Sequence, residues 1–183
     1  MALLLCLLAE MGDRCQLLGL AFAVRYGRAM AIMAGIVVAA FANATLSAVA
    51  GSLLAPMLGA DARTLFLALA LLVSGASLVM RVKAPDPLAG WRIGPFLTSA
   101  LGVFILAFGN GAQFLTVAVT VRTGDPVMTA IGAALGVTLA MLPAVLFRAQ
   151  FFAHAPLRLI RRAGGGVLIL IGAVLALGAT GLL

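Results

Sequence analysis

The chain has 183 residues, of which 64% are hydrophobic and only 9% are charged. This composition excludes an ordinary soluble domain and predicts a polytopic membrane protein that lies almost entirely in the bilayer. The formal net charge of +7 does not indicate nucleic-acid binding, because the basic residues fall near the ends of apolar segments and form no run interleaved with aromatic residues.

Six apolar segments follow one another along the chain, each about 20 residues or longer, which is enough to cross roughly 30 Å of hydrocarbon as a helix. They run approximately over residues 2–25, 29–54, 63–81, 95–121, 126–150 and 160–182. Helix is the expected state, because a backbone in lipid must satisfy its hydrogen bonds within each span. The sequence therefore predicts an all-α membrane protein with six transmembrane helices in one domain, residues 1–183.

The two halves of the chain share residue types at one constant offset. A shift of 97 residues pairs Gln16 with Gln113, Gly12 with Gly109, Arg25 with Arg122, Gly27 with Gly124, Gly35 with Gly132 and Gly75 with Gly172, without a gap. We therefore predict two three-helix repeats, residues 1–83 and 95–183, joined by a linker at 84–94. Because three is odd, the second repeat would be inverted in the membrane, as in many secondary transporters. A chance alignment of two apolar stretches is the alternative.

Basic residues are unevenly divided between the predicted loops. The second and fourth loops hold only Arg63 and Arg122. The first, third and fifth loops hold Arg25, Arg28, Arg81, Lys83, Arg92, Arg148, Arg158, Arg161 and Arg162. The positive-inside rule then places both termini on the non-cytoplasmic side. We expect a bacterial inner-membrane protein.

Glu10 and Asp13 interrupt the first apolar segment. A charged side chain at bilayer depth costs roughly 2.5–3.5 kcal/mol on insertion scales, so such residues are usually functional. Three residues apart, the two acids are predicted to share one helix face near mid-bilayer. Two carboxylates balance one divalent cation and can also hold protons, which predicts a site that exchanges one for the other. The alternative is a purely structural charge cluster with Arg14.

The segment Glu10-Met11-Gly12-Asp13-Arg14-Cys15-Gln16 resembles the E-x-G-D-[KR]-[TS] signature of the gadolinium-tolerance family of cation/proton exchangers, part of the lysine-exporter superfamily. The resemblance implies two inverted three-helix repeats, each with one copy of the motif, and exchange of Mn²⁺ or Ca²⁺ for protons. Cys15 stands where the family has Thr or Ser. Its softer thiol would favour Zn²⁺ or Cd²⁺ if it reaches the site. Otherwise Cys15 is a small packing residue.

The second copy of the motif has lost its charges. Ala107, Asn110 and Gly111 stand where the offset places Glu10, Asp13 and Arg14. Amide oxygens can still bind a cation, but they supply no charge and exchange no proton. The predicted metal ligands are Glu10, Asp13, Gln16, Asn43, Asn110 and Gln113.

The sequence thus predicts a secondary transporter that exchanges a divalent cation, Mn²⁺ or Ca²⁺, for protons and exports it from the cytoplasm. The alternative is a degenerate relative that does not transport alone, or one subunit of a heteromeric transporter. An enzyme is not expected, because no His-Glu-x-x-His or Ser-Lys constellation occurs in any span. No resident cofactor is predicted. The expected partners are the cation, protons and membrane lipid, and a homodimer is left open.

Overall fold

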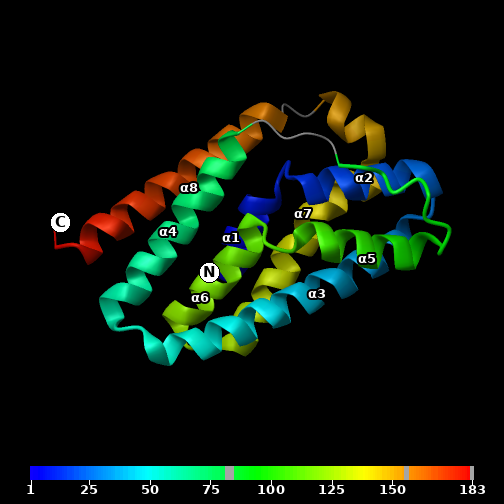
Figure 1. Ribbon diagram of the computed structural model, residues 1–183. Coiled ribbons are helices and arrows are strands. Elements are labelled where there is room, and N and C mark those ends of the chain that lie inside the picture. Colours follow the sequence, from blue (N-terminus) through cyan, green and yellow to red (C-terminus); the bar gives the residue numbers. More distant parts are fainter. Residues whose placement is uncertain (81–84, 155–156, 182–183) are drawn as a thin grey trace.

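The computed structural model describes residues 1–80, 85–154 and 157–181, and these are helical apart from short connections (Figure 1). The elements are α1 (Ala2–Glu10), α2 (Arg14–Tyr26), α3 (Ala29–Leu54), η1 (Ala55–Met57), α4 (Ala60–Val79), α5 (Pro95–Ala107), α6 (Gly111–Thr123), α7 (Pro126–His154) and α8 (Leu157–Ala179). The all-α prediction is confirmed. Arg81, Lys83 and the predicted boundary at residues 83–84 lie outside the described residues.

Four helical stretches of the described chain are long and apolar enough to cross a membrane: Ala29–Met57, Ala60–Val79, Pro126–Arg148 and Arg158–Ala179. The α5–α6 pair makes a fifth if its two helices, bent by 67° at their junction, count as one span. The predicted continuous helices 2–25 and 95–121 are wrong, because each is broken into two. A sixth span, formed by α1 and α2 together, stays a prediction.

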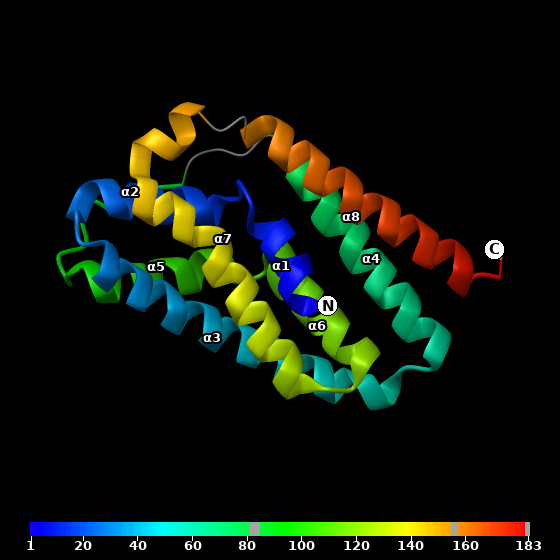
Figure 2. The same cartoon turned by 180° about the vertical axis from the view of Figure 1, so that it is seen from behind.

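The helices pack in reciprocal pairs. α4 and α8 lie side by side along one flank in both views (Figure 1, Figure 2). α3 packs on both α7 and α5, α1 on α7 and α6, and α2 on α5 and α7, while α6 contacts α3. Exchanging the halves, α1–α4 for α5–α8, returns the same set of contacts. α6 also packs on α4, and this contact has no comparable counterpart between α2 and α8 among the described residues. The inverted repeat that would explain this pattern stays a prediction.

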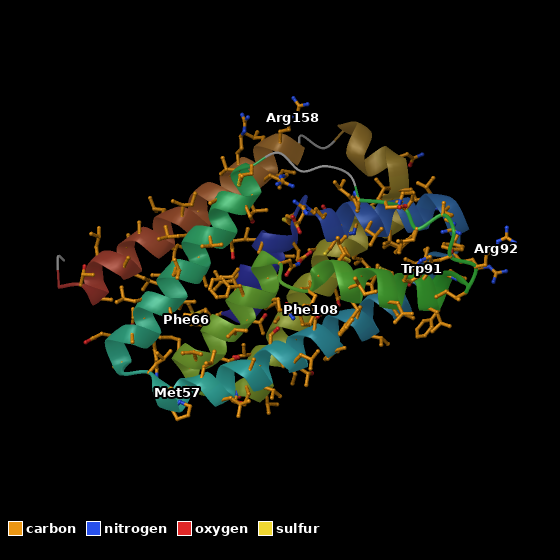
Figure 3. The ribbon with its side chains drawn as sticks, in the orientation of Figure 1. Met57, Phe66, Trp91, Arg92, Phe108 and Arg158 are labelled. Carbon is orange, nitrogen blue, oxygen red and sulfur yellow. The ribbon has the colours of Figure 1, made fainter. Side chains whose placement is uncertain are left out.

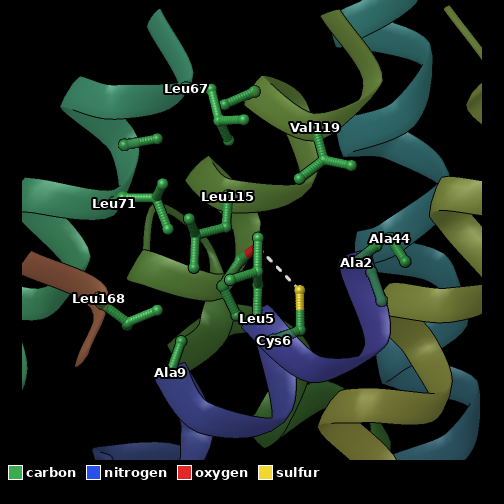
Figure 4. Packing of buried hydrophobic residues seen from close by; sticks show 14 of the residues in the cluster. Ala2, Leu5, Cys6, Ala9, Ala44, Leu67, Leu71, Leu115, Val119 and Leu168 are labelled. Atoms are coloured by element: carbon green, nitrogen blue, oxygen red, sulfur yellow. Dashed lines mark hydrogen bonds between the residues drawn. The ribbon is translucent and has the colours of Figure 1, made fainter. Parts of the chain in front are cut away.

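Buried apolar side chains form two clusters. The first includes Leu5, Leu71 and Leu115 and joins α1 and α6 to α4, α7 and α8, with a contribution from α3 (Figure 4). The second includes Phe22 and Ile36 and joins α2 and α5 to α3 and α7. Because α1 and α2 belong mainly to different clusters, as do α6 and α5, the two helix breaks lie where the clusters meet.

Glycines allow the helices to approach closely. A Cβ on Gly75 would lie 2.7 Å from the carbonyl oxygen of Gly165, and one on Gly165 would lie 2.7 Å from that of Gly75. The α4 and α8 backbones are therefore in direct contact. Gly172 packs on the α4 backbone in the same way, near Ala68. Small residues at such contacts are typical of membrane helix pairs, which are held by van der Waals packing.

We predict that Gly165→Ala destabilises the protein and that Gly166→Ala does not. The new methyl group of the first variant would meet backbone atoms of α4, whereas Gly166 has open space at its Cβ position. Overpacking should cost about 1–3 kcal/mol, while the helix propensity of Ala over Gly should leave the second variant as stable or slightly more stable. Thermal unfolding in detergent measures both. Equal melting temperatures would contradict the close contact of α4 and α8.

Candidate functional site

The first helix break lies between Glu10 and Arg14. α1 ends at Glu10, Met11 is extended (φ −64°, ψ 112°), Gly12 is left-handed (φ +76°) and Asp13 is the N-cap of α2. A left-handed φ favours glycine because no Cβ is present to clash. The prediction that Glu10 and Asp13 share a helix face is therefore wrong. Unwinding of the chain, rather than helical periodicity, brings the two acids together.

The second half contains the same break. α5 ends at Ala107, Phe108 is extended (φ −65°, ψ 119°), Gly109 is left-handed (φ +78°) and Asn110 is the N-cap of α6. The dihedral angles given for the two breaks agree within 7°. The two local structures are therefore alike although only the first carries acids.

Two glutamines brace the two breaks. The Gln16 side-chain oxygen accepts a hydrogen bond from the Gly12 N–H at 2.7 Å, and Gln113 does the same for Gly109 at 2.5 Å. Gln16 Nε2 also donates to the Ala140 carbonyl. Both ends of the Gln16 amide are thus engaged. Each glutamine satisfies a backbone donor that the broken helix leaves without its usual partner.

Glu10 lies fully inside the protein, with 1% of its surface exposed. Its Oε1 accepts a hydrogen bond from Asn110 Nδ2 at 2.5 Å, whereas its Oε2 is buried and has no hydrogen-bond partner among the described residues. Asn110 Oδ1 accepts from the Gln113 N–H at 2.9 Å and caps α6. Asn110 was predicted to offer a carbonyl oxygen to the cation. In this structure that oxygen is used in the cap, and the amide donates to Glu10 instead.

Asp13 and Cys15 complete a cluster around Glu10. One carboxylate oxygen from each acid and the Cys15 Sγ all lie within 4.8 Å of one another. Cys15 is fully buried and Asp13 is partly buried, whereas Arg14 is exposed. The exposed position of Arg14 weakens the alternative in which Glu10, Asp13 and Arg14 form only a buried structural charge cluster.

Two cavities meet at the second break. The smaller, about 20 Å³, has room for roughly one water and is lined by Glu10, Asn43, Asn110 and Gln113, among others. The larger, about 410 Å³, is lined by Asp13, Asn110, Ser77 of α4 and Met80 directly after α4, among others. Asn110 thus borders both cavities. Neighbouring Phe108, in the connection between α5 and α6, also lines the larger cavity, and its side chain is exposed (Figure 3).

Asn43 faces the smaller cavity from α3. Its Nδ2 donates to the Phe104 carbonyl at 3.2 Å, and its Oδ1 lies 3.4 Å from Gln113 Nε2. The structure therefore groups Glu10, Asn43, Asn110 and Gln113 at one cavity, whereas Asp13 lines the other cavity together with Asn110. Gln16 lines neither cavity and instead contacts the backbone of the first break at Gly12.

Arg161 is the residue at this site that the sequence did not single out. It was counted among the loop arginines, but it lies in α8 and is buried, with 9% exposed. Its guanidinium donates to the Gly12 carbonyl in the first break and to the carbonyls of Ser77, Leu78 and Met80 at the end of α4. It also interacts electrostatically with Asp13. A basic residue at the end of a predicted span is typical of a topology signal. Only the tertiary structure shows that Arg161 contacts the first break and the end of α4.

A buried carboxylate at a helix break within an apolar helical bundle indicates an ion-translocating membrane protein. A family model described as "Divalent cation/proton antiporter GDT1" matches residues 1–86. A protein of Vibrio cholerae serotype O1 (strain ATCC 39541 / Classical Ogawa 395 / O395), named "Putative manganese exporter", is 33% identical over 168 residues, which cover 89% of this chain and 82% of that protein. No solved structure matches the chain.

The chain belongs to the GDT1 family of divalent cation/proton antiporters, as its motif resemblance implied. It is a multi-pass membrane transporter and not an enzyme. Divalent cations and protons are the substrates that the family implies.

We predict that Arg161→Met destabilises the first break and that Arg162→Met does not. The first variant leaves the carbonyls of Gly12 and of the α4 end without their donor, at a cost of about 1–3 kcal/mol for each buried group. Arg162 is exposed and serves as the matched control. Unfolding in detergent measures the stability, and amide hydrogen exchange at residues 11–14 should accelerate only in Arg161→Met. Equal exchange in both variants would exclude the bracing role.

Proposed function

We propose that the chain exchanges Mn²⁺ for protons and exports the metal from the cytoplasm, with Glu10 and Asp13 as its charged ligands. The observation that carries this proposal is the buried Glu10 carboxylate, whose Oε2 has no hydrogen-bond partner among the described residues. A buried anionic oxygen without a donor is costly unless a cation or a proton occupies it. Mn²⁺ is favoured by the name of the Vibrio cholerae relative, and Ca²⁺, which also prefers oxygen ligands, is the second candidate.

Asn43 is the next ligand in this proposal. Among the described residues, its Oδ1 has only a long contact of 3.4 Å to Gln113, and Asn43 lines the same cavity as Glu10. Asn110 and Gln113 would act from the second half by positioning Glu10 and Asn43 through hydrogen bonds. Gln16 would support the first break. The cation would thus be held mainly by the first half of the chain.

Alternating access would depend on Asn110, which lines both cavities. The larger cavity extends along α4 to Met80, the end of α4 next to the predicted cytoplasmic loop. A cation from that side would reach Asp13 first. Glu10 lines the smaller cavity, which shares Asn110 with the larger one. Protons would replace the cation on the same carboxylates, so that one substrate can load only after the other has left.

The inverted repeat is part of the proposal. The matching dihedral angles of the two breaks and the reciprocal helix contacts support it. With both termini outside the cytoplasm, as the loop arginines predict, rocking of one half against the other would carry the site between the two sides of the membrane.

We predict that Glu10→Gln and Asp13→Asn each abolish proton-driven Mn²⁺ transport. In inside-out vesicles with an acidic lumen, an exporter should accumulate Mn²⁺, and each neutral variant should reduce this uptake by about tenfold or more, since each removes a charged ligand. Asp61→Asn is the control, because this exposed acid lies in the first turn of α4. Full uptake by both site variants would remove the two acids from the mechanism. Accumulation only in right-side-out vesicles would reverse the proposed direction.

The loss of acids from the second motif favours the alternative, a relative that does not transport alone. We predict that the purified single chain transports Mn²⁺ in proteoliposomes and that Asn110→Asp raises its Mn²⁺ affinity by about tenfold or more, because the added carboxylate would lie beside Glu10. Asn110→Ser is the control, since Ser caps a helix without adding charge. No transport by the wild-type chain, combined with transport by Asn110→Asp, would identify a degenerate site.

A further inference from the structure

Cys15 lies inside the acidic cluster rather than beside it. Its Sγ is fully buried in the first turn of α2, within 4.8 Å of carboxylate oxygens of both Glu10 and Asp13. Zn²⁺ binds sulfur at about 2.3 Å and oxygen at about 2.0–2.2 Å in tetrahedral geometry, so two ligands of one ion lie about 3.4–3.6 Å apart. The three atoms, all within 4.8 Å of one another, are therefore close to this spacing, and side-chain movements of about 1 Å would let them contact the same ion.

Asn110 contacts two of these atoms through one amide nitrogen. Its Nδ2 donates to Glu10 Oε1 at 2.5 Å and to Cys15 Sγ at 3.7 Å. The carboxylate and the sulfur thus converge on a single donor group. The second Glu10 oxygen, Oε2, is buried and has no hydrogen-bond partner among the described residues. A cation bound to Oε2 of Glu10 could contact the Cys15 sulfur at the same time.

The other cysteine provides a contrast. Cys6 is equally buried, but its Sγ is engaged by the Ala112 carbonyl at 3.7 Å and the Thr116 hydroxyl at 3.5 Å within the first apolar cluster (Figure 4). At the position in the second half that matches Cys15, the offset places Ala112. The sulfur donor of the cluster therefore comes from the first half alone.

We propose that Cys15 is a third ligand of the transported cation and that its sulfur extends the substrate range to thiophilic divalent ions, represented by Zn²⁺ and Cd²⁺. This inference rests on the proposed cation site and adds a ligand and a selectivity to it. Soft sulfur ligands favour such ions, whereas Ca²⁺ takes oxygen ligands. When sulfur binds the metal, the thiol proton leaves to solvent, and the resulting thiolate adds negative charge that the second motif no longer supplies.

Cd²⁺ binding to the purified full-length chain in detergent tests the proposal. A cadmium–thiolate bond has its own ultraviolet charge-transfer absorption, which reports sulfur coordination independently of transport. We expect one such band per chain in the wild type, its loss in Cys15→Ser and Cys15→Ala, and its retention in Cys6→Ser. The ratio of Cd²⁺ to Mn²⁺ affinity should fall about tenfold or more in Cys15→Ser, equivalent to about 1.4 kcal/mol. Competition by Ca²⁺ should be weak in the wild type and stronger in this variant.

The outcomes separate this inference from the proposed function. A band that is absent from the wild type, persists in both Cys15 variants or disappears only in Cys6→Ser would overturn the ligand assignment, and so would an unchanged affinity ratio. Mn²⁺ transport by the wild type in that case would leave the proposed function intact. A Cys15-dependent band without transport of any ion would support the ligand and overturn the transporter proposal. Circular dichroism and gel filtration establish that each variant is folded.

Discussion

The site depends on one constraint, the need to satisfy backbone groups where a membrane helix unwinds. In lipid, an unpaired N–H or carbonyl costs several kcal/mol, so a broken helix survives only with internal partners. Gln16 supplies an acceptor to the Gly12 N–H, and Arg161 supplies a donor to the Gly12 carbonyl. These two contacts stabilise the break, and the break in turn places Glu10 and Asp13 at the meeting point of the two apolar clusters.

The two breaks have the same shape and different chemistry. The first break carries Glu10, Asp13 and Cys15, which are all potential metal ligands. The matching positions of the second break hold Ala107, Asn110 and Ala112. The dihedral angles are preserved because Gly109 and the Asn110 cap require no carboxylate. Backbone geometry and charge are therefore separable in this architecture. The second half supports the site with hydrogen bonds, while the first supplies its negative charge.

Arg161 links this site to the α4–α8 pair. Its guanidinium contacts the first break and the end of α4 at once, and its side chain fills the space where a Cβ on Gly12 would lie. Gly12 is thus required both by its left-handed φ and by the approach of Arg161. If α8 moved relative to α1, the contact between Arg161 and Gly12 would either break or move with α8. The helices α4 and α8 are thus connected through Arg161 to the segment that holds Glu10 and Asp13. The contact with Arg161, the close packing of α8 and the left-handed backbone of the first break therefore all depend on Gly12.

The sequence by itself determined the membrane class, the helical state and the family, and it pointed to Glu10 and Asp13, because hydropathy and charged residues within apolar segments are read directly from composition and spacing. It also paired Gly12 with Gly109 and Gln16 with Gln113, which have matching roles in the structure. Tertiary structure alone decided that both helices break, that Asn110 donates to Glu10, and that Arg161 and Cys15 reach the acids. Helical periodicity assumes a continuous helix, and these contacts arise where it ends, between residues up to 149 positions apart in the chain.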